Sequence, residues 1–241
     1  MQKHPHAGEG AEKKPRQFVQ YAFFKVDPAW RRLPSAEKDA GKREFIAVCD
    51  DLSGRLAIHK TYSLTGVRGD TDFLLWSVSD TLETLHELGT RLNATGLGKW
   101  LDSPYKYLAM TRESIYIKGH EHEGQEGART RMSLHNNKYL FVYPFVKMRK
   151  WYALPMEQRR KIMGPHFRIG HEFPSVSIHT AYSYGLDDQE FMLGFETDHP
   201  QDFLDLVMSL RDTEASAYTE RETPIFTCIA MDLPRVLDAL G

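Results

Sequence analysis

The C-terminal half of the chain carries most of the side chains whose types could do chemistry. Tyr143 and Lys147 occur in the segment YPFVK, and His166 follows some twenty residues after the lysine. His166 lies three and four residues after Met163 and Ile162, so on a continuous helix its imidazole would share their core-facing side. A neutral imidazole in an apolar wall is a suitable ligand for iron. From spacing alone, an ordinary core or surface histidine is the commoner explanation.

Common catalytic and nucleotide-binding motifs are absent from the sequence. It contains no GxGxxG, GxxxxGK[ST], HExxH, CxxC or GxSxG segment. These absences argue against the usual nucleotide-binding, zinc-protease and serine-hydrolase classes. The formal net charge is -2, so the chain also lacks the global positive charge of nucleic-acid binders, and we expect no nucleic-acid partner.

Several segments occur together in an order that resembles one known family. They are YPFVK at 143–147, WYALPMEQRR at 151–160, His166, GLDD at 185–188 and TEAS at 213–216. In this order and spacing they resemble the chlorite dismutase and coproheme decarboxylase family of haem proteins. The resemblance covers about residues 139–228, whereas the N-terminal half matches only in the pattern of its elements.

The resemblance implies that His166 is the proximal ligand of a haem iron, because the family carries a histidine on the matching helix. It also implies that Glu214 is the carboxylate that hydrogen-bonds this imidazole, which would orient the ring and raise its basicity. Without the family, a surface glutamate at a helix end explains Glu214 equally well. Pro165 cannot donate a helical hydrogen bond, so we expect a kink before His166 and keep His171 as an alternative ligand.

Three residues match family positions near the reacting propionates. The resemblance implies that Tyr143 forms a radical that removes hydrogen from a propionate, and that Lys147 pairs with the carboxylate being lost. Trp151 matches a tryptophan near the second propionate in actinobacterial decarboxylases. Without the family, Tyr143 and Lys147 are better explained as a sheet aromatic and a solvated strand end, and Trp151 equally well as core.

One position opposite the proximal ligand separates the subgroups of the family. Chlorite dismutases carry an arginine about seven residues before the glycine of GLDD, where this chain has Ile178. Firmicute-type decarboxylases carry glutamine there, and actinobacterial ones a small apolar residue. Isoleucine cannot donate a hydrogen bond to hypochlorite, which favours decarboxylation over chlorite splitting. The spacing from His166 is one residue shorter than in several relatives, so His179 is the alternative aligned position.

The distal base and the propionate anchors are expected in the loop between the two halves. Actinobacterial relatives use a loop histidine to activate peroxide, and a near-neutral pKa suits that role. His122 is our first candidate, with His120 and His135 as alternatives, although solvent-exposed loop histidines are at least as good an explanation. The guanidinium groups of Arg129 and Arg131 suit carboxylates, with solvated linker charges as the alternative.

The elements that must position these residues follow the same order in both halves. Hydrophobic periodicity predicts β-α-β-β-α-β twice. The first half has predicted strands at 17–27, 56–66, 71–79 and 103–119, with helices at 35–52 and 81–96. The second half has predicted strands at 137–147, 175–185, 190–198 and 223–232, with helices at 153–163 and 199–216 and a short terminal helix at 233–241.

This order is that of a ferredoxin-like unit. We therefore predict an α+β protein in which two tandem ferredoxin-like units form a fold of the dimeric α+β barrel type. The N-terminal unit is expected at 16–118 and the C-terminal, haem-binding unit at 138–241. Residues 1–15 are polar and predict a disordered tail, and residues 119–137 predict a linker loop.

The composition is that of an ordinary globular protein, with 41% hydrophobic and 27% charged residues. No apolar run approaches the length of a membrane span, and no secretory signal is visible. Cys49 and Cys228 are too few for a disulfide framework. We expect a cytoplasmic protein with reduced thiols.

The resemblance implies an enzyme that uses hydrogen peroxide to decarboxylate two propionates of coproheme III, giving haem b, and that assembles as a homopentamer. Three alternatives stay open. They are a chlorite dismutase or haem peroxidase of the same fold, a haem-binding protein without activity, and a protein of this fold that binds no haem.

Overall fold

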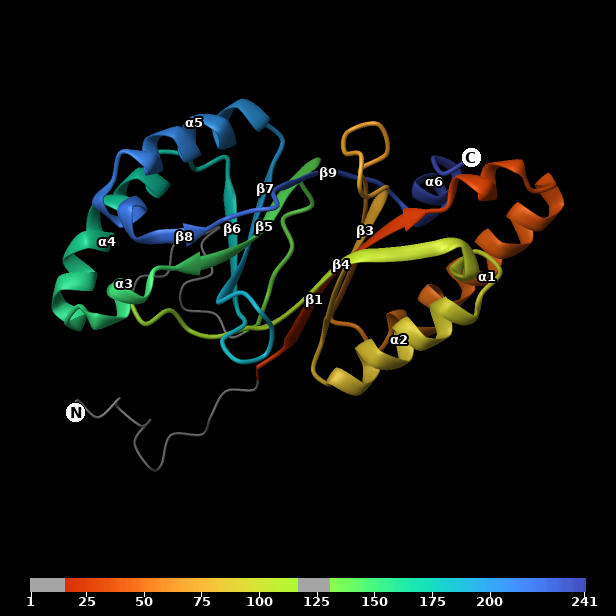
Figure 1. Ribbon diagram of the computed structural model, residues 1–241, viewed down its shortest axis with the longest axis horizontal. Helices are drawn as coiled ribbons and strands as arrows, with labels where there is room; N and C mark the ends of the chain where they lie inside the picture. Colours follow the sequence, from red (N-terminus) through yellow and green to blue (C-terminus); the bar gives the residue numbers. More distant parts are fainter. Residues whose placement is uncertain (1–15, 117–130) are drawn as a thin grey trace.

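The computed structural model of the protein describes residues 16–116 and 131–241. It has an α+β fold with a large antiparallel sheet (Figure 1). The first half comprises β1 (Phe18–Val26), α1 (Ser35–Ser53), β2 (Ile58–Ser63), β3 (Phe73–Ser79), α2 (Leu82–Ala94) and β4 (Leu101–Met110), with 3-10 turns η1 (Pro28–Arg32) and η2 (Gly98–Trp100).

The second half contains β5 (Tyr139–Lys147), α3 (Arg149–Ala153), α4 (Met156–His171), β6 (Ser177–Tyr182), β7 (Phe191–Thr197), α5 (Pro200–Arg211), the 3-10 turn η3 (Glu214–Tyr218), β8 (Thr219–Arg221), β9 (Phe226–Ala230) and α6 (Leu233–Asp238). Two helices differ from the sequence prediction. Helix α4 continues through Pro165 to His171, because a proline removes only one helical hydrogen bond. Helix α5 ends at Arg211, since the Thr213 hydroxyl donates to the Leu210 carbonyl at 2.7 Å and the TEAS segment turns into η3.

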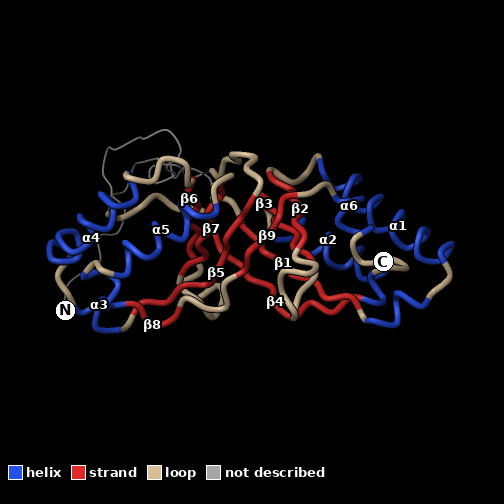
Figure 2. Tube along the Cα trace, turned by 90° about the horizontal axis from the view of Figure 1, so that it is seen from above, coloured by secondary structure: helices blue, strands red, loops and turns tan. Residues whose placement is uncertain are grey.

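The strands follow the order β7-β6-β4-β1-β3-β2-β9-β5-β8, and β5 also pairs with β7. Pairing within each half is extensive, whereas the halves join through short contacts. Met110 pairs with Tyr182 between β4 and β6, and residues 62–63 pair with 229–230 between β2 and β9. Figure 2 shows the strands at the centre of the molecule and the helices towards its two ends.

The core is divided by the sheet. Aromatic residues from both halves, including Tyr21, Trp76 and Phe226, pack between the two halves. Helices α1 and α2 cover the other side of the first half, and α5 covers that of the second. Helix α6 packs against α1 and β2, so the end of the chain completes the first half (Figure 1).

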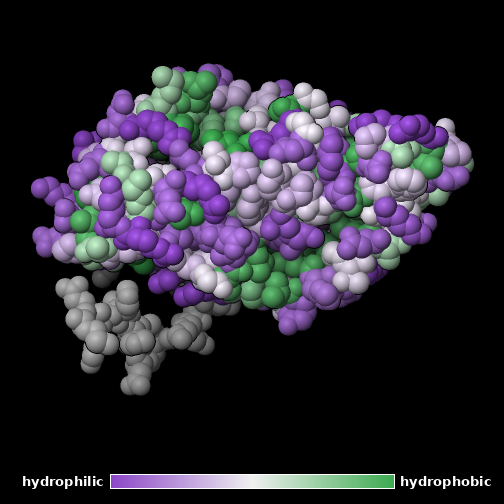
Figure 3. Space-filling model, viewed as in Figure 1, coloured by the Kyte–Doolittle hydropathy of each residue, from purple (hydrophilic) through white to green (hydrophobic). Residues whose placement is uncertain are grey.

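The surface of α5 is partly apolar. Leu204 and Met208 are exposed on this helix, and Figure 3 shows a group of hydrophobic residues, in green, on the surface in the region of α5. Within residues 16–116 and 131–241, no helix combines the length and the hydrophobicity needed to cross a membrane. Cys49 and Cys228 are both buried free thiols.

Candidate functional site

A cavity lies in the second half, between the strands and helices α4 and α5. Most of its wall is apolar, with side chains from β5, β6, β7, α4 and α5: Phe145, Met163, Phe167, Ile178, Phe191, Leu193, Phe195, Leu206, Val207 and Leu210. An apolar pocket with a few convergent polar groups is the usual form of a cofactor or small-molecule site.

His166 projects from α4 into the wall of this cavity. Burial lowers the pKa of its imidazole to about 4, and the positive charge of Lys147 acts in the same direction. The ring is therefore neutral at pH 7 and has a nitrogen lone pair for a metal ion. His171, the alternative ligand, is exposed at the last position of the helix and does not line the cavity.

Tyr143 and Lys147 both line the cavity from β5, four residues apart and therefore on one side of the strand. The Tyr143 ring is 7% exposed and stacks on Phe195, with 5.7 Å between ring centroids. Burial raises the pKa of Tyr143 well above its ordinary value; the Glu222 carboxylate adds to this rise and Arg211 opposes it. The phenol is thus protonated at physiological pH.

Lys147 is a buried cation in the same wall. Its Nζ atom donates a hydrogen bond to the Ala215 carbonyl at 2.8 Å and lies 4.9 Å from the centroid of the Trp151 ring. Burial lowers the pKa of Lys147 to about 8, although the carboxylates of Glu222 and Glu190 act against this change. The side chain carries its charge at pH 7 and could receive a substrate carboxylate.

Trp151 lies on α3 and is 1% exposed. Its indole Nε1 donates to the Tyr116 hydroxyl at 3.1 Å, and its ring centroid is 5.2 Å from that of Tyr218. The indole therefore has a hydrogen-bond partner and a fixed place beside the lysine.

Neighbouring residues of β6 face opposite sides of the sheet. Ile178 lines the cavity, whereas His179 is fully buried between the halves, with its Nε2 atom 2.9 Å from Oε2 of Glu196. Side chains alternate along a strand, so only one of the two can face the cavity. Of these two alternative residues, Ile178 is therefore the one whose side chain lines the cavity.

The buried Glu196 carboxylate anchors a second polar cluster outside the cavity. It accepts a hydrogen bond from Lys60 Nζ at 2.7 Å and from the His135 backbone at 3.1 Å, besides its contact with His179. Burial alone would raise the pKa of Glu196, but the hydrogen bonds and charges of His179 and Lys60 outweigh it and lower the pKa to about 2. This cluster connects β2 of the first half with β6 and β7 of the second.

Some candidates from the sequence lie away from the cavity. Glu214 is exposed at the start of η3 and is not part of the lining. Arg131 is exposed and forms an ion pair with Asp80 at 3.4 Å, and His135 belongs to the Glu196 cluster. His120, His122 and Arg129 lie outside the described residues.

The cavity also contains polar residues that the sequence did not single out: Arg112, Ser114, Tyr116, Tyr182, Arg211, Ser216 and Glu222. The alternation Ile178, Thr180, Tyr182 along one strand face could have indicated Tyr182. The two arginines and Glu222 carry no such periodic signal, because loops and helix ends bring them to the site.

Comparisons with known proteins agree with this architecture. The profile of the family described as chlorite dismutase matches residues 38–231. A coproheme decarboxylase from Mycolicibacterium smegmatis is 31% identical over 211 residues, which is 87% of this chain and 88% of that protein.

Two solved structures show the same fold. A chlorite dismutase from Candidatus Nitrospira defluvii in complex with imidazole gives a TM-score of 0.83 at 22% identity and covers 93% of this chain and 94% of its own. A haem-binding protein from Thermus thermophilus gives a TM-score of 0.83 at 21% identity, over 98% of this chain and 100% of its own. The family profile spans most of the sequence, and the chain therefore belongs to the chlorite dismutase family.

Proposed function

We propose that the protein is a coproheme decarboxylase, which uses hydrogen peroxide to convert two propionates of coproheme III into the vinyl groups of haem b. The observation that carries the proposal is that Tyr143, Lys147 and His166 line one largely apolar cavity. The relative named coproheme decarboxylase supports it. Ile178 adds to this support, because its side chain has no hydrogen-bond donor to offer a chlorite-derived oxygen.

The lining fits an iron porphyrin. Its apolar side chains suit the macrocycle, and the neutral His166 imidazole would bind the iron. The cations Arg112, Lys147 and Arg211 lie in the same wall and match the carboxylates of the propionates. When bound, the iron porphyrin supplies the redox chemistry with hydrogen peroxide.

Tyr143 and Lys147 have separate parts in the proposed reaction. Tyr143 gives up its phenol hydrogen atom and then takes a hydrogen atom from the β-carbon of a propionate. Lys147 holds the carboxylate of that propionate until it leaves as carbon dioxide. For each turnover, one propionic acid group and one hydrogen peroxide give one vinyl group, one carbon dioxide and two water molecules, which balances atoms and electrons.

The fold proposal follows from the strand order. We infer that the halves are tandem ferredoxin-like units, because β4-β1-β3-β2 and β9-β5-β7-β6 are equivalent orders. The β5–β7 pairing completes a circuit of strands, which supports a barrel. The homopentamer and the role of His122 as distal base stay predictions from the resemblance. The same holds for Glu214 as the hydrogen-bond partner of the proximal imidazole, and Arg129 and Arg131 stay predicted propionate anchors.

The experiment is anaerobic reconstitution with coproheme, followed by stepwise hydrogen peroxide and mass spectrometry of the pigment. We expect two successive losses of carbon dioxide and two hydrogen atoms, ending at haem b. Tyr143→Phe should bind coproheme without converting it, whereas Tyr139→Phe, on the same strand but outside the cavity lining, should behave as the wild type. Binding without any mass change would refute the proposal, and oxygen release from chlorite would replace it with chlorite dismutation.

A further inference from the structure

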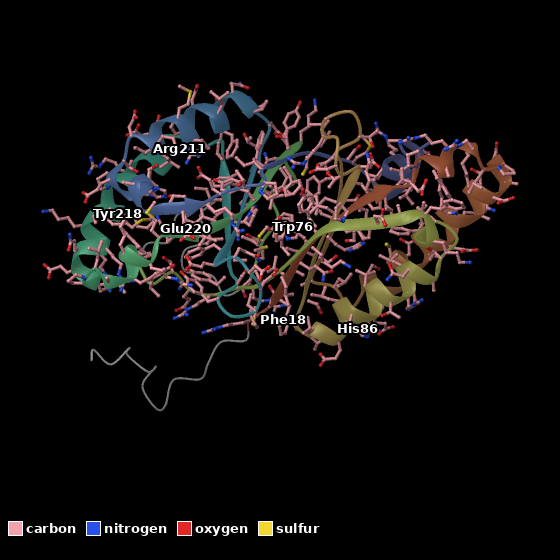
Figure 4. All side chains as sticks on the ribbon, viewed as in Figure 1. Phe18, Trp76, His86, Arg211, Tyr218 and Glu220 are labelled. Carbon is pink, nitrogen blue, oxygen red and sulfur yellow. The ribbon has the colours of Figure 1, made fainter. Side chains whose placement is uncertain are left out.

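One of the cavity cations already has a partner within the protein. Arg211 is the last residue of α5, Glu222 follows β8, and their side chains form an ion pair. Both side chains also line the cavity. Figure 4 labels Arg211 at the end of α5 and Glu220 on β8, the strand that Glu222 follows.

Glu222 is the unusual member of the lining. Among the described residues of the cavity wall, it is the only carboxylate, beside Arg112, Lys147 and Arg211. The charge of Glu222 acts on both residues of the proposed reaction, because it raises the pKa of Tyr143 and the pKa of Lys147. A carboxylate fixed at this place repels a propionate, so the two compete for the same region.

The guanidinium of Arg211 makes that competition specific. Its planar fork matches one carboxylate at a time with two parallel hydrogen bonds. The Arg211 side chain is partly exposed, at 45%, so its ion pair is weak enough for one carboxylate to replace another. In the structure the carboxylate paired with Arg211 is that of Glu222.

We propose that Glu222 is the internal counter-ion of Arg211, which a porphyrin carboxylate displaces on binding and which returns to Arg211 when that carboxylate has left. The role rests on the proposed function and goes beyond it by naming the residue that sets the affinity for carboxylates at this corner of the cavity. The exchange makes and breaks only hydrogen bonds and an ion pair. It lowers the affinity for a carboxylate-bearing porphyrin and leaves that for an uncharged one unchanged.

The test compares two metal-free probes, coproporphyrin III and its uncharged tetramethyl ester. Their binding to the full chain is followed by quenching of tryptophan fluorescence, to which the cavity residue Trp151 contributes. Glu222→Gln should bind coproporphyrin about threefold to fivefold more tightly, the range for a partly exposed ion pair, and should bind the ester as the wild type does. Glu220→Gln is the matched control, because Glu220 is exposed on β8 and does not line the cavity.

A second variant makes the result decisive. Arg211→Gln should weaken coproporphyrin binding by about tenfold, and adding Glu222→Gln to it should give no gain, because the counter-ion then has nothing to neutralise. Equal coproporphyrin affinity in the wild type, Glu222→Gln and Glu220→Gln would overturn the role, as would a gain that persists without Arg211. Failure of the wild type to bind coproporphyrin at all would instead refute the proposed function, and this role with it.

Discussion

Lys147 is a buried cation that favours the binding of a carboxylate but lowers the stability of the folded protein. It is 9% exposed, and its Nζ atom has one hydrogen bond, to the Ala215 carbonyl, and two aromatic rings at 4.9 and 5.2 Å. Burial lowers its pKa from an ordinary 10.5 to about 8. At about 1.4 kcal/mol for each pH unit, keeping the charge in the fold costs about 3 kcal/mol at pH 7.

Replacing this lysine by methionine should therefore stabilise the porphyrin-free protein. Lys147→Met keeps the length of the side chain and removes the buried charge, but it also loses a hydrogen bond of about 1 kcal/mol. We expect the free energy of unfolding to rise by about 2 kcal/mol at pH 7. The same variant should bind coproporphyrin more weakly, because the carboxylate loses its cation.

The lowered pKa of Lys147 determines how the stability difference between Lys147→Met and the wild type changes with pH. The unfolded chain keeps the lysine protonated up to about pH 10.5, whereas the folded protein releases that proton near pH 8. Between these values the unfolded state binds more protons, so the stability of the wild type increases with pH. The advantage of Lys147→Met is thus complete below about pH 8 and decreases towards pH 10.5.

Urea unfolding at about pH 7 and about pH 9.5 measures both quantities. Lys150→Met is the matched control, because Lys150 is exposed on α3, and its free energy of unfolding should stay within about 0.5 kcal/mol of the wild type. If Lys147→Met destabilises the protein by more than about 1 kcal/mol at pH 7, or differs from the wild type equally at both pH values, the assigned cost of the buried charge is wrong.

His166→Ala should remove the absorption that coordination by this imidazole gives the reconstituted iron porphyrin. In the wild type that absorption should persist at weakly acidic pH, because burial lowers the pKa of the free imidazole to about 4 and coordination opposes its protonation further. Glu196→Ala should lower the free energy of unfolding by about 3–5 kcal/mol in urea titrations, because Lys60 and His179 lose their buried carboxylate. The pKa of Glu196 is lowered to about 2, so its contribution in the wild type is present above about pH 4.5 and is lost as the pH falls towards 2, which acid-unfolding curves measure. Tyr143→Phe should keep coproheme affinity within about twofold and lose the conversion seen by mass spectrometry, and conversion at the wild-type rate would contradict the radical role.

The order of strands and helices could be predicted because each element has its own periodic signal. Strand β3 begins with four apolar residues, Phe73 to Trp76, and α2 combines a Thr81 cap with buried Leu85, Leu88 and Leu92. Other features depend on contacts between distant segments. Strand β8 has three residues, too few for a period, and α6 packs on the first half of the chain through its Val236 and Leu237 side chains.

The residues of the candidate site likewise include some that the sequence indicates and others that depend on contacts between distant segments. His166, Tyr143, Lys147 and Trp151 belong to one motif-bearing stretch, and the structure brings them to one cavity, while their roles stay predictions. Arg211 could not be selected from the sequence, because an arginine at a helix end resembles any solvated charge until its neighbours are known. The position of a residue in a motif likewise does not reveal whether its side chain lines the cavity, and Glu214 is exposed outside the lining.

Strand β6 connects the cavity to the buried ion pair on its other face. In its register with β7, His179 lies opposite Gly194, where an added Cβ atom would be 3.2 Å from the Tyr21 hydroxyl and 3.6 Å from the His179 Cβ. The missing side chain leaves room for His179 to reach Glu196. A slip of one residue would turn His179 into the cavity, and the buried Glu196 carboxylate would keep Lys60 but lose the histidine. The contact between His179 and Glu196 therefore helps to hold Ile178 in the cavity wall.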